Sequence, residues 1–398
     1  MDAVIEHDLA ALREQVIDAN RDRRPLEITG GGTKDFYGCV APVPPAMPGS
    51  PALAGSPASR GSAGTPAAAP LAGESQRPLE VLDCRANRGI ISYEPTELVI
   101  NARCGTPLLE IEEALAANRQ YLPFEPPHFG SAATLGGAVA AGLSGPRRMA
   151  VGALRDYVLG TTLLTARGDV LRFGGQVMKN VAGYDVSRLL AGSLGILGVI
   201  AEVSLKVLPL PAAEQTLQFE ISEAEGIRRC NQWGGQPLPI SATLWDGGRL
   251  WVRLSGARAA VDAAASRLGG ERLEPAQAAE LWRAVREQTH PFFDGAAVLW
   301  RLSLPPVTPP LELTGRQLIE WGGALRWHVP VHDHASSRAL RELVARVGGS
   351  ATLFRAGPRA TVARFHPLEE ALRQIHLRLK QEFDPHRIFN PGRMYDWL

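Results

Sequence analysis

Two glycine-punctuated stretches without Asp, Glu, Lys or Arg constrain the fold of this chain more than any other feature. They cover residues 126–145 and 189–201, and most of their side chains are small or apolar. Neither suits a membrane helix, because glycines interrupt both and the second is too short to span a bilayer. Small side chains allow a backbone to approach another backbone or a flat ligand closely. We therefore expect both stretches to be buried at such a contact.

The length and charge of the chain narrow its class. It has 398 residues, with Lys+Arg 42, Asp+Glu 41 and a formal net charge of +1. This length fits two domains, and the charge balance excludes a general attraction to nucleic acid or anionic lipid. The four cysteines form no C-x-x-C, so there is no signature of an iron–sulfur cluster or zinc ribbon. Free thiols and an acidic N-terminus without a signal peptide predict a cytoplasmic protein.

Composition divides the chain into parts. Residues 41–78 are rich in Pro, Ala, Gly and Ser. We interpret them as a disordered surface insertion, because they bury too little apolar surface to offset their ordering entropy. After Pro211, candidate strands alternate with amphipathic helices, which is typical of an α+β domain. We therefore predict one domain over residues 1–211, a second over residues 212–368, and a C-terminal segment over residues 369–398.

Hydrophobic periodicity and turn residues predict the elements. In one helix, Thr106 is expected to be the cap and Pro107 to occupy the first turn. Helices are expected at residues 8–19, 106–118, 186–191, 258–268, 275–287, 336–347 and 369–382. Strands are expected at residues 25–29, 80–83, 98–102, 158–166, 169–173, 199–208, 215–221, 240–245, 250–254, 297–304, 324–331 and 351–356.

The first motif with chemical content is Gly30-Gly31-Gly32-Thr33-Lys34, at the end of a predicted strand. Three glycines permit positive φ, and successive N–H groups can then form a concave nest for a phosphate. The motif is not a P-loop, because it lacks G-x-x-x-x-G-K-[ST]. A plain tight turn is the competing interpretation.

The second motif runs through residues 125–142 and is almost entirely small. Its N–H groups could bind a diphosphate, and Thr134 adds a hydroxyl donor. Close packing of a helix against a sheet is the alternative. The third motif covers residues 179–202, with glycines at 192, 195 and 198. It is not a Rossmann fingerprint, because its helix precedes its strand.

Together these motifs resemble the FAD-binding domains of the vanillyl-alcohol oxidase and p-cresol methylhydroxylase type. That family has a glycine-rich nest, then A-T-x-G-G, then G-Y-D with G-S-x-G-x-L-G-x-I. The tail matches its closing signature through Asp384-Pro385 and Asn390-Pro391-Gly392-Arg393. The resemblance implies an α+β fold, with a two-subdomain FAD-binding domain to which the C-terminal segment returns. It also implies a smaller cap domain with an antiparallel sheet covered by helices.

Within that family the chain is most similar to the FAD-binding subunits of bacterial glycolate oxidase (glycolate dehydrogenase). The similarity lies in Glu125-Pro126-Pro127-His128, Gly174-Gly175-Gln176-Val177-Met178-Lys179-Asn180 and Trp321-Gly322-Gly323-Ala324-Leu325-Arg326-Trp327. Residues 41–78 depart from it. The first glycine loop contains no His for covalent attachment, so we predict noncovalent FAD.

The resemblance implies a set of FAD-binding residues. Two glycine-rich segments would hold the pyrophosphate, a third would line the adenine and ribose side, and Asn390 would close over the flavin. Arg147, Arg148 and Lys179 are candidate cations near the ring, against the alternative of solvated surface charges. The expected FAD-binding residues are Gly30, Gly31, Gly32, Thr33, Lys34, Pro127, Ala133, Thr134, Gly136, Gly137, Gly142, Arg147, Arg148, Lys179, Gly192, Gly195, Val199, Ile200 and Asn390.

The sequence gives fewer indications of which residues bind the substrate. Arg301 or Arg326 could clamp a carboxylate in a catalytic role, or could form ion pairs or stack on tryptophan. Related hydroxy-acid dehydrogenases carry H-x-G-D-G-N-x-H, and residues 348–355 here lack both His and Asp. The three histidines His328, His332 and His334 are not spaced so that their side chains would meet around one ion. We therefore predict no metal site.

These features predict a FAD-dependent oxidoreductase that is one subunit of a glycolate dehydrogenase complex. The complex would oxidise glycolate to glyoxylate, and a larger flavoprotein subunit and an iron–sulfur subunit would be its partners. It would contact the inner face of the cell membrane only as a complex. Two alternatives remain: a self-sufficient D-lactate-type dehydrogenase, and a structural subunit that keeps the flavin fold without catalysis. Oxidation of glycolate needs a base that takes the proton of its hydroxyl, and the motif that supplies this base in related enzymes is missing here. This argues that the chain does not oxidise glycolate itself.

Overall fold

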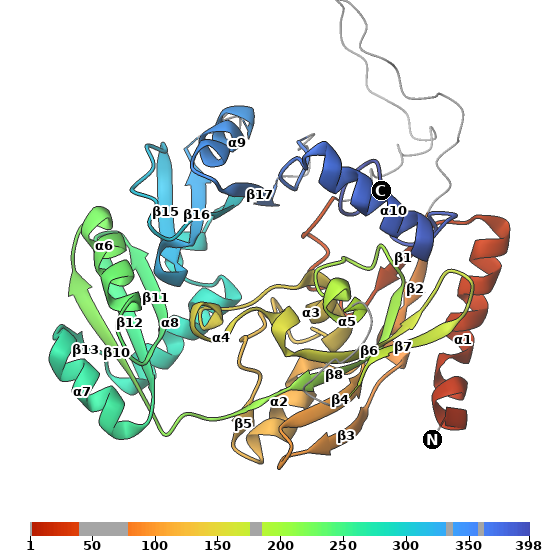
Figure 1. Cartoon of the computed structure of the whole chain (residues 1–398), viewed down its shortest axis with the longest axis horizontal. Helices are drawn as coiled ribbons and strands as arrows, with labels where there is room; N and C mark the ends of the chain where they lie inside the picture. The colour runs from red at the N-terminus through yellow and green to blue at the C-terminus, as the bar shows by residue number, and fades with distance from the viewer. Residues whose placement is uncertain (1, 40–78, 176–184, 332–336, 357–361) are drawn as a thin grey trace, which may run out of the picture.

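The computed structural model describes residues 2–39, 79–175, 185–331, 337–356 and 362–398. The predicted insertion at residues 41–78 lies outside them, as do Lys179, His332 and His334. Figure 1 shows two main bodies of secondary structure, one around a five-stranded sheet and one around an eight-stranded sheet. The expected α+β class and antiparallel cap sheet are confirmed. No helix among the described residues combines the length and apolar character needed to cross a bilayer.

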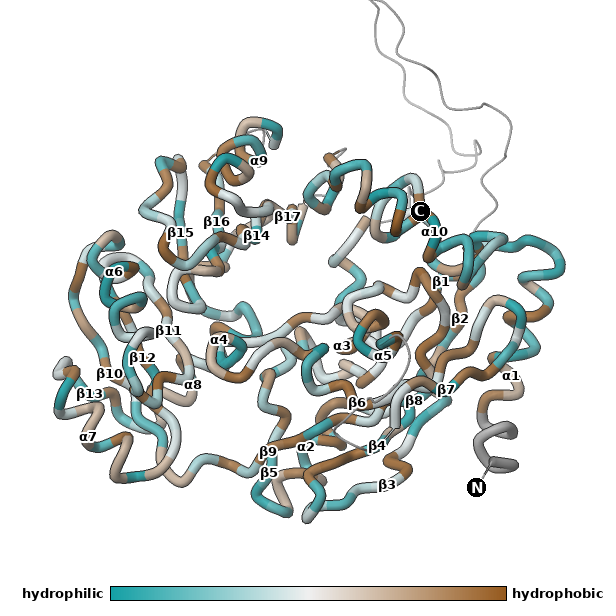
Figure 2. Tube along the Cα trace, viewed as in Figure 1, coloured by the Kyte–Doolittle hydropathy of each residue, from teal (hydrophilic) through white to brown (hydrophobic). Residues whose placement is uncertain are grey.

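The five-stranded sheet is antiparallel throughout, with the order β3-β4-β8-β6-β7. Its core includes buried residues of α2, α3 and the strands. In Figure 2 hydrophobic residues concentrate along this sheet, whereas outer helices alternate between hydrophobic and hydrophilic residues. The elements are β3 (Ile90–Glu94), β4 (Val99–Arg103), α2 (Leu108–Ala116), α3 (Leu135–Ala141), α4 (Arg148–Val151), β6 (Val158–Leu164), β7 (Val170–Gly174), α5 (Val186–Leu190) and β8 (Val199–Lys206), with β5 (Gln120–Tyr121) paired to β9 (Leu208–Pro209).

The two ends of the described chain meet. Helix α1 (Asp2–Asp22) is followed by β1 (Leu26–Thr29), which pairs in parallel with β2 (Glu80–Asp83). The segment after α10 (Glu370–Phe383) lies beside β1: Leu26 N donates to Ile388 O at 2.6 Å, and Asn390 N donates to Leu26 O at 2.9 Å. The C-terminal segment therefore adds hydrogen bonds directly to β1.

A buried ion pair fixes this C-terminal segment. Lys380 Nζ contacts Asp384 Oδ2 at 2.8 Å and also donates to the carbonyl oxygens of Ile196 and Phe389. The Asp384 carboxylate in turn accepts from the amides of Ile388 and Phe389. Paired and fully hydrogen-bonded charges are the form in which burial is tolerated. Asp384, of the closing Asp-Pro, therefore stabilises the turn that places Asn390 beside β1.

The second body is an antiparallel sheet with the order β13-β10-β12-β11-β15-β16-β14-β17. Helices cover it and share apolar clusters with it. The elements are β10 (Ala213–Glu220), α6 (Glu223–Gly234), β11 (Ile240–Asp246), β12 (Arg249–Gly256), α7 (Arg258–Leu268), β13 (Glu271–Arg272), α8 (Pro275–Glu287), β14 (Leu299–Ser303), β15 (Gly315–Glu320), β16 (Leu325–Pro330), α9 (Ser337–Arg346) and β17 (Ser350–Arg355).

Most of the expected elements are present, and α7 and α8 have the predicted bounds. The elements that were not predicted include β3, α3, α6 and β15, although Ser222 caps α6 by accepting from Glu225 N. The expected cap at Thr106 was wrong, because the residue flanking α2 is Pro107 and makes no side-chain cap. The Thr106 hydroxyl instead hydrogen-bonds both the N–H and the C=O of Gly89.

Candidate functional site

Three separated segments of the chain converge on one cleft, which we call the first cleft. Its empty space, including the open mouth, is about 790 Å³. The segments are the glycine loop after β1, helix α3 with its cap Thr134, and the C-terminal turn that holds Asn390; Leu194 also lines the cleft. Of the expected FAD-binding residues, those that line it are Gly30, Gly31, Gly32, Thr33, Lys34, Thr134, Gly137 and Asn390.

The glycine loop has the properties of an anion nest. Among the described residues, the N–H groups of residues 31–34 have no hydrogen-bond partner. A Cβ at Gly31 would lie 1.6 Å from the carbonyl oxygen of Ala132, so only glycine allows this loop to touch the second motif. Free backbone donors on a concave loop suit a diphosphate.

The second motif contributes less backbone than expected. The amides of Ala133, Leu135 and Gly136 already donate to the carbonyl oxygens of Gly130, Thr106 and Cys104 respectively. Gly137 N donates to the Thr134 hydroxyl, which caps α3. This segment therefore packs a helix against its neighbours, as the alternative interpretation held. It presents Thr134, Gly137, Ala140 and Ala141 to the first cleft.

Asn390 links the C-terminal turn to β1 and to Leu194. Its Oδ1 accepts from Ile28 N at 2.7 Å, and its Nδ2 donates to Leu194 O at 2.7 Å. A Cβ on Gly195 would lie 2.7 Å from that Nδ2, so the neighbouring glycine leaves room for the amide. Asn390 was expected to close over the flavin; in the structure its side chain lines the first cleft and bonds the backbone around it.

Lys34 supplies a buried cation at this cleft. Its side chain is 8% exposed, and its Nζ lies 3.2 Å from the carbonyl oxygen of His128 and 5.7 Å from the centroid of the Phe129 ring. Burial lowers the pKa of Lys34 to about 8, against a raising effect of Glu287. An anion in the cleft would be a favourable partner for this ammonium. Arg393 also lines the cleft, a residue that sequence reasoning did not assign to the site.

Other residues expected at the cofactor do not line the first cleft. Val199 and Ile200 are buried in β8, where they belong to apolar clusters. Ala133 is likewise core, and a Cβ on Gly136 would lie 2.7 Å from the Cβ of Cys104. Of the other three expected glycines, Gly142 and Gly192 contact each other, since a Cβ on Gly142 would lie 2.8 Å from the Cα of Gly192, and Gly195 lies against Asn390. These residues shape the walls behind the cleft.

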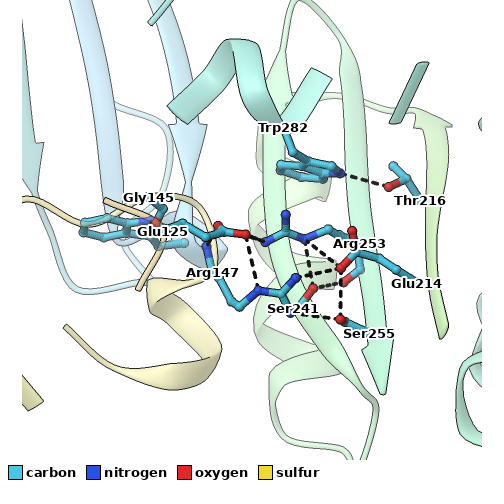
Figure 3. A network of polar contacts seen from close by, with 10 residues as sticks. Glu125, Gly145, Arg147, Glu214, Thr216, Ser241, Arg253, Ser255 and Trp282 are labelled. Carbon is cyan, nitrogen blue, oxygen red and sulfur yellow. Dashed lines mark hydrogen bonds and ion pairs between the residues drawn. The ribbon is translucent and has the colours of Figure 1, made fainter. Parts of the chain in front are cut away.

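Arg147 has a different environment from the one expected. Its guanidinium reaches Glu214 at 2.6 Å and the Ser255 hydroxyl at 2.9 Å, and its Nε lies 3.3 Å from Glu125. Arg253 approaches the same Glu125 carboxylate at 2.9 Å (Figure 3). Two carboxylates thus occupy this arginine in a buried network that links the loop after β5 to β10 and β12. The arginines hold the pKa of Glu125 below its usual value despite burial.

Arg148 and Arg326 also lie away from the first cleft. The Arg148 guanidinium stacks 4.4 Å from the centroid of the Trp321 ring. Arg326 is fully buried, donates to the carbonyl oxygens of Thr308 and Pro309, and lies 3.9 Å from Glu223. For Arg326, the approach to Glu223 corresponds to the alternative of ion pairing; the alternative weighed for Arg148 was a solvated surface charge, and its guanidinium instead stacks on an indole.

A second cavity of about 370 Å³ lies between residues 127–146 and the eight-stranded sheet. Arg301 and Glu320 line it, as does the expected residue Pro127. Trp327 Nε1 donates to Glu320 Oε1 at 2.7 Å. Burial raises the pKa of Glu320 to about 7, and burial lowers the pKa of Arg301. Sequence reasoning missed Glu320, because a lone glutamate before Trp-Gly-Gly carries no motif.

An aromatic wall lines the place where the two cavities meet. Tyr37, which lines the first cleft, packs 5.1 Å from Phe354, which lines the second cavity. Phe354 also packs 4.9 Å from Trp327, measured between ring centroids. The two cavities are therefore neighbours. Within the described ranges no group of His, Cys, Asp and Glu could hold a metal ion.

Comparisons with known proteins agree with this architecture. A family model described as "FAD binding domain" matches residues 67–174. Glycolate oxidase subunit GlcE of Escherichia coli (strain K12) is 46% identical over 385 residues, 97% of each chain. Glycolate oxidase subunit GlcD of Bacillus subtilis (strain 168) is 34% identical over 128 residues, 32% of this chain and 27% of that protein. A solved alkyldihydroxyacetonephosphate synthase covers 96% of this chain and 75% of its own, with TM-score 0.61 and 15% identity, and so shares the fold.

The fold, the first cleft and these comparisons define a FAD-dependent oxidoreductase subunit. FAD, expected from the resemblance, is thereby confirmed as the cofactor. The free amides of residues 31–34, the buried Lys34 and the open face of Gly137 fit its diphosphate. More narrowly, the chain belongs to the family of glycolate oxidase subunit GlcE.

Proposed function

We propose that this chain is the FAD-binding subunit of a complex that oxidises glycolate to glyoxylate and passes the electrons to an iron–sulfur partner subunit. The single observation that carries the proposal is the convergence of the glycine loop, Gly137 and Asn390 on one cleft. The full-length similarity to a glycolate oxidase subunit gives that cleft its context. The division into a FAD domain (1–211), a cap domain (212–368) and a returning segment (369–398) belongs to the same proposal.

The chain's own residues would hold the cofactor without a covalent bond. The amides of residues 31–34 and the ammonium of Lys34 would bind the diphosphate. Asn390 would keep the surrounding loops together. Once bound, FAD supplies the capacity to take two electrons from a substrate and release them singly. The aromatic wall of Tyr37 and Phe354 would keep water from the far end of the cleft.

The partners follow from the chemistry that the chain lacks. It has no C-x-x-C and no metal-ligand group among its described residues, which supports the proposal that the electrons leave to another protein. Subunits named for glycolate oxidase include GlcD as well as GlcE. A larger flavoprotein subunit and an iron–sulfur subunit are the partners that we propose, in the cytoplasm and at the membrane only through the complex.

One observation favours a second candidate function, a self-sufficient 2-hydroxy-acid dehydrogenase. The missing His-rich motif argued against a base in this chain. The second cavity, however, holds the buried carboxyl of Glu320 together with Arg301. A carboxyl with a pKa near neutrality is suited to accept a proton.

Purification of the chain with and without its partner subunits tests the proposal. The expected result is a yellow protein with one FAD per chain that reduces an artificial acceptor with glycolate slowly alone and rapidly in the complex. A purified chain that stays colourless after incubation with FAD would contradict the proposal and favour a structural subunit. Rapid turnover by the chain alone would instead support the self-sufficient dehydrogenase.

A further inference from the structure

Three residues of the second cavity lie on one face of the eight-stranded sheet. Arg301 of β14 is directly opposite Trp327 of β16, and Trp327 is directly opposite Leu318 of β15. Glu320 lies two residues beyond Leu318 and therefore points to the same face. The hydrogen bond from Trp327 Nε1 to Glu320 Oε1 agrees with this arrangement. The sheet register thus places a cation and a carboxyl on either side of one indole.

The polar groups of this cavity have unused bonding capacity. Arg301 makes no hydrogen bond or ion pair with any described residue. Its guanidinium lies 5.3 Å from the centroid of the Trp321 ring and interacts electrostatically with Tyr37 and Glu320. Glu320 is 4% exposed, and its Oε2 has no partner in the part of the chain that the structure describes. A guanidinium and a carboxyl oxygen without partners, both facing a small cavity, are the groups that a ligand would satisfy.

We propose that the second cavity binds a small 2-hydroxy acid, with its carboxylate on Arg301 and its hydroxyl on Glu320, and that Glu320 is the catalytic residue that takes the hydroxyl proton. This inference rests on the proposed function, since it assigns the substrate side of the same reaction. Arg301 offers a planar pair of donors that matches a carboxylate. Trp327 is a positioning residue, because it holds one carboxyl oxygen and leaves the other free.

The proton transfer balances within the cavity. The O–H bond of the ligand breaks, and its proton bonds to Oε2 of Glu320. The electron pair stays on the ligand oxygen and forms the second C–O bond as the carbon loses its hydride. FAD bound in the neighbouring first cleft would supply the two-electron acceptor for this hydride, and the product would be a 2-oxo acid. Glu320 later returns its proton to water.

The charges around Glu320 determine how binding depends on pH. Arg301 of β14 and Arg253 of β12 favour the ionised carboxyl, whereas Glu125 of the loop after β5 disfavours it, and Trp327 of β16 donates to it. Because burial dominates, the pKa of Glu320 is about 7 in the free protein. A bound carboxylate adds negative charge beside Glu320 and favours the neutral form. Carboxylate affinity should therefore fall as pH rises through this pKa, while the rate of proton abstraction should rise.

The test uses the full chain and titrates it with glycolate and with acetate, which lacks the hydroxyl. Arg301→Met should weaken both ligands about tenfold or more, as expected for the loss of a charged hydrogen-bond pair, while Arg301→Lys should restore part of the acetate affinity. Arg341→Met is the matched control, because Arg341 also stacks at 5.3 Å on a tryptophan but does not line this cavity. The control should bind both acids normally, and all variants should keep their FAD.

Glu320→Gln separates proton transfer from structure. It should keep acetate binding, lose the preference for glycolate, and make acetate affinity independent of pH between about pH 6 and pH 8, where the wild-type affinity falls. Reduction of the flavin by glycolate should slow by about 10² or more. Normal glycolate binding in Arg301→Met, or an unchanged pH profile in Glu320→Gln, would overturn the inference. A yellow wild-type chain that binds neither acid would also overturn it and would leave the cofactor proposal intact, whereas a colourless chain would count against the proposed function.

Discussion

The backbone amide of Ile28 donates to Oδ1 of Asn390 at 2.7 Å across 362 positions of the sequence. The same side chain donates to Leu194 O. One asparagine thus holds the glycine loop and the loop after α5 in their places around the first cleft. It does so with a positive φ of 41°, which asparagine tolerates better than most residues.

Replacing Asn390 should therefore loosen the first cleft. Asn390→Ala leaves two buried backbone groups unpaired, and we expect a loss of about 2–4 kcal/mol in unfolding free energy, with weaker FAD retention. Asn390→Asp keeps an acceptor for Ile28 but turns a buried carboxylate oxygen toward the carbonyl oxygen of Leu194, so its loss should be no smaller. Urea denaturation and the FAD content after gel filtration measure both effects. Equal stability of wild type and Asn390→Ala would show that these bonds are not needed.

Gly137→Val should remove FAD without unfolding the chain. A Cβ at this position would lie 3.2 Å from Thr134 Oγ1, a contact that a small shift relieves, and the side chain would then enter the first cleft. Gly234→Val is the control, because a Cβ there meets nothing within 4 Å and the residue lies at the end of α6. The visible spectrum should disappear only for Gly137→Val, while circular dichroism stays unchanged. A yellow Gly137→Val protein would show that the diphosphate lies elsewhere.

Glu125→Gln should destabilise the contact between the two sheets. The change leaves Arg147 and Arg253 buried with less compensating charge, which typically costs about 3–5 kcal/mol. Because the pKa of Glu125 is lowered in the folded protein, its contribution is present at neutral pH and is lost on acidification. The control is Glu110→Gln, whose partner Arg88 is exposed, and it should lose less than about 1 kcal/mol. Thermal unfolding at neutral and acidic pH distinguishes them, and similar losses in both variants would be a contrary result.

Lys34→Met should weaken FAD binding about tenfold or more, the effect of losing about 1.4 kcal/mol of charge interaction. The pKa of Lys34 is lowered to about 8 by burial, so the ammonium loses its proton as pH rises through that value. Wild-type FAD affinity should then decline between about pH 7 and pH 9, and the affinity of Lys34→Met should not. Fluorescence titration of the FAD-free protein measures this. A wild-type affinity that stays constant over this range would exclude Lys34 as a ligand of the diphosphate.

The sequence alone determined the family-level features of this protein. Runs of small residues, the glycine loop and the closing Asn-Pro-Gly depend on local composition, so they could be recognised without coordinates. The helices α7 and α8 were equally predictable, because their apolar spacing and flanking residues are local signals. The composition of residues 133–137, however, could not show that most of its amides are already bonded to neighbouring segments.

Only the tertiary structure decided which charged side chains face a cavity. Arg301 and Arg326 were equivalent in the sequence, but β14 pairs with β16 so that Arg301 lies opposite Trp327, and Arg326 consequently points to the other face. Side chains alternate along a strand, so a shift of one residue in register would have exchanged the two. The role of Glu320 could be recognised only from the structure, for the same reason. Its burial, and with it the raised pKa of its carboxyl, results from strands that are distant in sequence and adjacent in the sheet.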